Sequence, residues 1–205
     1  MELPIYELKI NDSLKDDSEV SYVALVDEPA IKRDFILFND EKKKKKSKIE
    51  FKIISDEQRI ISGPLMLADE LIYRTPNKTI KTDHYVKFTA ETIKQIAIKF
   101  AKRKYQANVN LMHDENQVVK GVTMFESWIT DSTRGIKAME GFEDVADGSW
   151  FGSFFVENQE VWNSIKSGEY KGFSVEGLFD YEEALTPEEE ALKKIEHLLN
   201  EIIED

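Results

Sequence analysis

A hydroxyl and a carboxylate stand two residues apart in the segment 171–177, which reads KGFSVEG. Phe173 and Val175 favour a β-strand, and in a strand Ser174 and Glu176 face the same side. The glycines near each end allow a second backbone or a substrate to approach closely. This pattern can present a nucleophile at the edge of a sheet, although an ordinary strand with a surface serine shows the same pattern.

A serine hydroxyl needs a neighbouring base before it can attack a carbonyl at neutral pH. The chain has three histidines that could supply this base. His197 falls in a predicted C-terminal helix and is expected to be solvated, and His84 begins a predicted strand, where we expect a surface position. His113 stands at a strand or loop edge in the segment NLMHD (110–114) and is the best candidate for a general base. The alternative is a structural histidine.

His113, Asp114 and Glu115 also offer three kinds of metal ligand in consecutive positions. Consecutive side chains point in different directions, and no second histidine follows at the spacing of a His-Glu-x-x-His site. We therefore rank a metal-dependent hydrolase below a serine enzyme, and we expect neither a metal nor another cofactor.

The composition limits the classes of protein to which the chain can belong. Its 205 residues predict one domain with an appendage, and 41% hydrophobic residues can form a core. The net charge of -12 argues against general nucleic-acid binding and against anionic membranes. The absence of cysteine excludes disulfides and a cysteine nucleophile and fits a reducing cytoplasm. No apolar run reaches the ~20 residues of a membrane helix, and the N-terminus lacks a secretory-signal pattern.

Most of the chain has the pattern of short strands separated by turns. We predict strands, or pairs of strands, at 3–10, 19–26, 35–38, 49–54, 58–67, 84–88, 117–130, 149–156 and 171–177. The segment 58–67 is expected to be interrupted at Ser62-Gly63-Pro64, because proline cannot donate to a sheet. The segment 131–148 is predicted as an irregular acidic loop.

Two helices are predicted among these strands. Thr89 is expected to cap the first, and its apolar residues recur at helical spacing. The basic end of this helix, at 99–104, is expected to be solvated and to complement the helix dipole. Asn158 is expected to cap a second, shorter helix.

Two further segments differ from the rest in composition. The lysine run at 42–46 predicts a solvated loop at 41–48, with contact to an acidic partner or to nucleic acid as the alternative. The segment 186–205 begins with Thr-Pro-Glu-Glu and predicts an amphipathic helix that packs on the core or joins two copies. We therefore predict one domain at 1–182 and a separate helix at 186–205.

Eight segments together, in this order, resemble the XkdF-like phage serine proteases: VALVDEPAI (23–31), ISGPLM (61–66), LIYR (71–74), FTAETI (88–93), NLMH (110–113), ESWI (126–129), GSW (148–150) and GFSVEG (172–177). The resemblance covers residues 1–181 and leaves out the C-terminal segment. This family is similar to the phage prohead proteases and, more remotely, to the herpesvirus assemblins.

The resemblance implies an α+β, mainly β fold with a barrel-like antiparallel sheet and a few packed helices. It implies a hydrolase of phage or prophage origin, a serine endopeptidase that cleaves scaffold and major capsid proteins inside the prohead during capsid maturation and virion assembly. The expected location is the cytoplasm of the bacterial host. Self-cleavage and a homodimer or oligomer through the C-terminal helix are expected as well.

Matched residue by residue, Ser174 corresponds to the nucleophile of the family and His113 to the general base. The third member stays open, because relatives often carry Asp where this chain has Ser21, and serine cannot stabilise an imidazolium as a carboxylate does. Glu126 is the first substitute and Glu176 the alternative, and a Ser–His dyad is also open. The competing function is a non-catalytic head-assembly or scaffolding protein that retains the protease fold.

Overall fold

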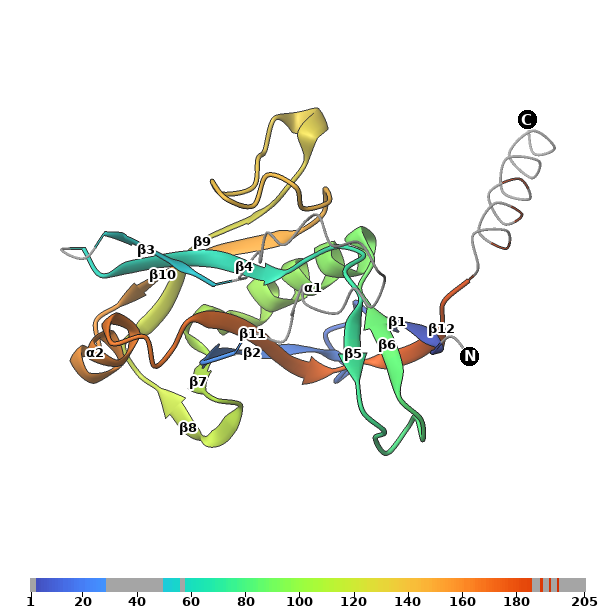
Figure 1. The fold of residues 1–205 in the computed structure, drawn as a ribbon, viewed down its shortest axis with the longest axis horizontal. Helices are drawn as coiled ribbons and strands as arrows, with labels where there is room; N and C mark the ends of the chain where they lie inside the picture. The colour runs from blue at the N-terminus through green and yellow to red at the C-terminus, as the bar shows by residue number, and fades with distance from the viewer. Residues whose placement is uncertain are drawn as a thin grey trace, which may run out of the picture.

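In the part of the chain that the structure describes, the strands form three four-stranded sheets, and two α-helices pack beside them. The computed structural model describes residues 3–28, 50–55 and 58–185, together with the single positions 189, 192 and 195. Two of the sheets lie one above the other in Figure 1, and the third lies at the end where the N-terminus is found.

The first sheet has the strand order β11-β2-β7-β8. Its second strand, β2 (Glu19–Val26), pairs with antiparallel β11 (Gly172–Leu178) on one side and with parallel β7 (Val109–Leu111) on the other. β7 continues through a tight turn into β8 (Asp114–Val119). This sheet carries the segments that contain Ser174 and His113.

The second sheet has the order β3-β4-β10-β9, formed by β3 (Lys52–Ser55), β4 (Ile60–Met66), β10 (Trp150–Val156) and β9 (Val122–Ile129). β4 runs without interruption through Ser62-Gly63-Pro64, so the predicted break is wrong. The pairing of β3 with β4 ends at Ser62, and Pro64 lies beyond it. Pro64 therefore needs no backbone N–H to donate toward β3.

The third sheet has the order β12-β1-β6-β5, formed by β12 (Asp180–Glu183), β1 (Ile5–Lys9), β6 (His84–Lys87) and β5 (Ile72–Arg74). β12 follows β11 after one residue, so the same stretch of chain crosses from the first sheet into the third.

Both predicted internal helices are confirmed. α1 (Ala90–Arg103) begins after Thr89, whose hydroxyl accepts from the Thr92 N–H, and α2 (Gln159–Lys166) begins after Asn158, whose amide oxygen accepts two backbone N–H groups. Short 3-10 helices span Tyr105–Ala107 and Ser132–Arg134, the latter within the predicted loop at 131–148. Neither α-helix is long and apolar enough to span a membrane, as judged on the described residues.

The basic end of α1 is not simply solvated as predicted. The side chain of Lys99 is 1% exposed, and its ammonium group donates to the carbonyls of Asn11 (2.8 Å), Asp16 (2.9 Å) and Ser18 (2.9 Å). Arg103 bonds to the Glu19 carboxylate at 2.8 Å. The helix therefore anchors the 11–18 turn and the start of β2 through buried polar contacts.

The mainly β composition is confirmed, but the barrel-like antiparallel sheet is not. The described strands form three separate sheets with unpaired outer edges, and none closes on itself. Two pairings, β1 with β6 and β2 with β7, are parallel. Parallel neighbours need a crossover connection, so hydrophobic patterning along single strands does not reveal them.

The predicted C-terminal helix falls largely outside the described residues. Its three described positions are helical, but Leu192 and Ile195 are 61% and 54% exposed, so an amphipathic helix with a buried face is not supported. The lysine-rich segment 41–48 and the predicted strand at 35–38 lie outside the described residues. The division into a domain at 1–182 and a helix at 186–205 stays a prediction.

The register of β11 against β2 depends on a glycine. A bulge separates Glu176 from Gly177, and a Cβ added at Gly177 would lie 1.9 Å from the Glu19 carbonyl oxygen. We expect Gly177→Ala to lower the free energy of unfolding by about 3 kcal/mol or more, measured by urea denaturation.

The matched control is Gly135→Ala. Its Cβ would meet nothing within 4 Å, although φ there is +72°. That substitution should cost only about 1 kcal/mol, from the left-handed backbone alone. Equal losses for the two variants would contradict a steric requirement at Gly177.

Candidate active site

Ser174 lies in the middle of β11, opposite Ala24 of β2, which in turn lies opposite Asn110 of β7. Residues that face each other across a sheet share the same side, and so do residues two apart in one strand. Ser174, Glu176 and Asn110 therefore project from one face, while Phe173 packs into the core on the other. The Ser174 side is nearly closed, since this residue is only 6% exposed.

Asn110 of β7 and Glu176 of β11 make contact across the intervening strand β2. The Asn110 amide donates to Glu176 Oε2 at 2.8 Å, and Asn110 is fully buried. A hydrogen bond to an ionised carboxylate is stronger than one between neutral groups. Asn110 thus fixes the position of Glu176, a role that residue type and spacing gave no reason to assign.

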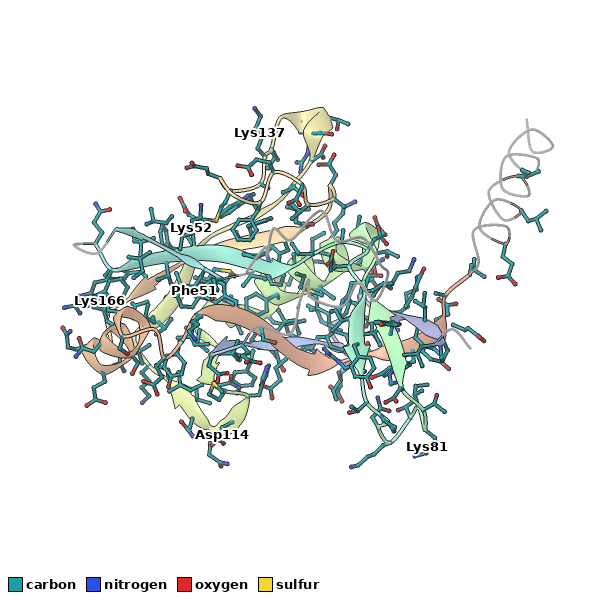
Figure 2. The ribbon with its side chains drawn as sticks, viewed as in Figure 1. Phe51, Lys52, Lys81, Asp114, Lys137 and Lys166 are labelled. Carbon is teal, nitrogen blue, oxygen red and sulfur yellow. The ribbon has the colours of Figure 1, made fainter. Side chains whose placement is uncertain are left out.

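His113 lies at the tip of the hairpin between β7 and β8, whose flanking residues Leu111 and Asp114 pair with each other. Its neighbour Asp114 is labelled at the edge of the molecule in Figure 2. Both residues of the turn have positive φ, 51° for Met112 and 59° for His113. Such two-residue hairpin turns favour Asn-Gly, because other residues are strained at positive φ. Strain of this kind gathers at functional sites.

The His113 turn is held from both sides. The Met112 N–H donates to the Leu25 carbonyl at 3.0 Å, which ties the turn to β2. The Asp114 carboxylate accepts from the Asn116 backbone and from the Gln117 and Asn116 side chains, and these hydrogen bonds lower the pKa of Asp114. Asp114 is therefore an anion whose hydrogen bonds hold the first residues of β8 in place.

The structure brings His113 and Glu176 together. His113 Nδ1 lies 3.5 Å from Glu176 Oε2, with the imidazole 42% and the carboxylate 25% exposed. Along the sheet, Glu176 is level with Tyr22, whereas the His113 turn follows Leu111, which is level with Leu25. The Glu176 carboxylate spans part of this separation, because the oxygen that meets His113 also accepts from Asn110, which is level with Ser174 through Ala24.

The structure does not bring the other predicted third member to this place. Glu126 is an exposed residue of β9 in the second sheet, opposite Ser153 of β10. The Ser21 hydroxyl donates to the backbone carbonyl oxygen of Glu176 at 3.5 Å and not to its carboxylate. No hydrogen bond joins Ser174 to His113 in the described part of the chain.

The surface position predicted for His84 is wrong. This residue is fully buried, its Nδ1 lies 2.8 Å from the Thr82 carbonyl, and its ring lies edge-on to Tyr6 and Tyr181. β6 places it opposite Arg74 of β5, on the inner side of the third sheet. His197 lies outside the described residues. Within the described ranges, no three His, Asp or Glu side chains are grouped so as to hold a metal ion.

A pocket of about 270 Å³ adjoins the candidate residues. β11 contributes Phe173 to Gly177 to its wall, so Ser174 and Glu176 both line it. The rest of the wall comes from the end of β4 and from residues around the third sheet, including Arg74, Phe88 and Phe179. A concave, mostly apolar site with a few polar groups is the usual form of a ligand site.

Comparisons with known proteins identify the family of the chain. A family model described as "Putative phage serine protease XkdF" matches residues 48–183. The chain belongs to this family of phage serine proteases. Neither a curated protein nor a solved structure matches the chain.

The contact between Asn110 and Glu176 can be tested by a double-mutant cycle. We expect Asn110→Ala to lower the free energy of unfolding by about 1–3 kcal/mol, because Glu176 loses a buried donor. Combined with Glu176→Ala, the loss should be smaller than the sum of the single losses by at least about 0.5 kcal/mol. Urea denaturation gives these values, with the exposed Asn163→Ala as control. Strictly additive losses would mean that the two side chains do not interact.

The strain at His113 predicts that glycine is more stable than alanine at this position. His113→Gly should raise the free energy of unfolding by about 1 kcal/mol relative to His113→Ala, because glycine adopts positive φ without a Cβ clash. Both variants lack the imidazole, so the comparison isolates the backbone. Equal unfolding midpoints for the two variants would show that the turn is unstrained.

Proposed function

We propose that the chain is a serine endopeptidase in which Ser174 is the nucleophile, His113 the general base and Glu176 the carboxylate that orients the base. The observation that carries this proposal is the 3.5 Å approach of His113 Nδ1 to Glu176 Oε2 on the face that carries Ser174. A carboxylate at Nδ1 selects the tautomer that leaves Nε2 free to accept a proton.

The reaction then follows from these positions. Ser174 Oγ attacks the carbonyl carbon of a peptide bond while its proton passes to His113 Nε2. The imidazolium, stabilised by Glu176, gives that proton to the leaving amine, and the C–N bond breaks. Water then hydrolyses the acyl-enzyme by the same proton path in reverse. Asn110 keeps the Glu176 carboxylate in place through its 2.8 Å hydrogen bond.

The substrates proposed here are the scaffold and major capsid proteins of a phage, cleaved inside the prohead in the host cytoplasm. Support for this comes from the family description, which names a phage serine protease. Self-cleavage and a homodimer or oligomer through residues 186–205 belong to the same proposal.

A second candidate function is a non-catalytic head-assembly protein with the protease fold. Ser174 is 6% exposed and forms no hydrogen bond with His113 in the described part of the chain, which suits such a protein. Catalytic hydrogen bonds are, however, often long before substrate binds. The two functions differ in whether Ser174 reacts.

The test is co-expression of the full chain with the scaffold and capsid proteins of the phage that encodes it, followed by intact mass measurement. Wild type should process these proteins, and Ser174→Ala and His113→Ala should not. Glu176→Gln should slow processing by up to about 10⁴-fold, the loss known for an orienting carboxylate.

Glu126→Gln is the matched control, because it makes the same chemical change on a strand of another sheet. It should process at the wild-type rate. A slow Glu126→Gln beside an unaffected Glu176→Gln would reverse the assignment of the third residue. Folded wild type that neither processes these proteins nor reacts with a fluorophosphonate probe would favour the assembly role.

A further inference from the structure

The pocket beside Ser174 lies along the outer edge of β11, whose strand partner among the described residues, β2, lies on the other edge. Just before β11, the Lys171 carbonyl accepts from the Phe51 N–H. The Val23 N–H donates to the Asn108 carbonyl, and the Leu25 carbonyl accepts from the Met112 N–H, so residues 23 and 25 of β2 turn their polar groups toward β7. Ala24 therefore bonds to Ser174. Because successive residues of a strand alternate in this direction, Val175 turns its N–H and C=O to the outer edge.

An extended peptide can use these main-chain groups, since strands readily add to an unpaired sheet edge. The pocket next to Val175 would then receive one of its side chains. Leu8, Leu65, Phe88 and Phe179 give this pocket apolar walls. Walls of this kind alone would select an aliphatic or aromatic side chain.

Arg74 changes this expectation, because it places a cation in the same wall. It stands two residues after the buried Ile72 in β5 and so shares its inward face. Its guanidinium donates to the Tyr73 carbonyl at 3.2 Å and forms no ion pair within the described residues. Burial lowers the pKa of Arg74, which reflects its loss of hydration.

Cations removed from water are usually paired with an anion, because an unpaired one is costly. Glu176 lines the same pocket but does not pair with Arg74, since its carboxylate is engaged by Asn110 and His113. A guanidinium also matches the geometry of a carboxylate with two parallel hydrogen bonds.

We propose that Arg74 is a specificity residue that selects peptides with an aspartate or glutamate side chain in the pocket beside Ser174. The predicted binding of such peptides depends only on the pocket and Arg74. Their cleavage near the acidic residue rests on the proposed function.

The first experiment measures binding in the absence of chemistry. The full-length Ser174→Ala variant is titrated with fluorescein-labelled octapeptide pools, in which one position at a time is Glu, Gln, Lys or Leu in a random background. At one position, the Glu pool should bind about tenfold or more tightly than the Gln pool, as expected for a charge-assisted hydrogen bond. This comparison needs no change at Arg74.

Two further variants, made in the Ser174→Ala background, assign the preference. Arg74→Gln should abolish the difference between Glu and Gln pools, and Arg74→Lys should retain part of it. Arg134→Gln removes the same charge from an arginine that is 62% exposed and paired with Asp131, so it should leave the preference unchanged. The proposal would be overturned if the Glu and Gln pools bound equally, if Leu were preferred, or if no pool bound. It would also be overturned if Arg74→Gln kept the preference for Glu.

The second experiment separates this inference from the proposed function. Wild-type protein is incubated with the same pools, and cut peptides are identified by mass spectrometry. Binding that prefers Glu without any cleavage would refute the endopeptidase and leave Arg74 as the selector. Cleavage with identical sequence preferences in wild type and Arg74→Gln would refute the role of Arg74 and leave the endopeptidase.

Discussion

The backbone register of β11 on β2, and of β2 on β7, is the constraint on which the candidate site depends. It aligns Ser174, Ala24 and Asn110 in one row across three strands. A shift of one residue would turn Ser174 and Glu176 toward the core and Phe173 outward. The bulge at Gly177, where only a residue without Cβ fits beside the Glu19 carbonyl, ends this register at a fixed place.

Around this row, rigid polar contacts and local strain hold the chemistry in position. Asn110 fixes the Glu176 carboxylate from the third strand, and the tight turn after β7 carries His113 toward the same carboxylate. Two consecutive residues at positive φ are unfavourable for stability, and the turn that they form carries the imidazole that lies 3.5 Å from Glu176. The site thus combines a strand, which is stiff, with a turn whose conformation its neighbours impose.

Lys99 and Arg74 show how differently an inward-facing charge can be used. Lys99 is satisfied by three backbone carbonyls and fixes the 11–18 turn next to β2, which is a structural role. Arg74 faces a pocket and has one backbone carbonyl as its partner among the described residues. The first charge is compensated within the fold, whereas the second is compensated best by a ligand, and this contrast motivates the proposed selection of acidic side chains.

The sequence by itself determined the local elements, because capping residues and the alternation of apolar side chains act over a few positions. Thr89, Asn158 and the β11 segment are examples, and the order of motifs identified the family. Only the tertiary structure decided that Glu176 and not Glu126 is the neighbour of His113. It also decided that His84 and Lys99 are buried, and that Asn110 is a hydrogen-bond partner of Glu176. These facts depend on parallel pairing and on contacts between segments more than sixty residues apart, which no local pattern encodes.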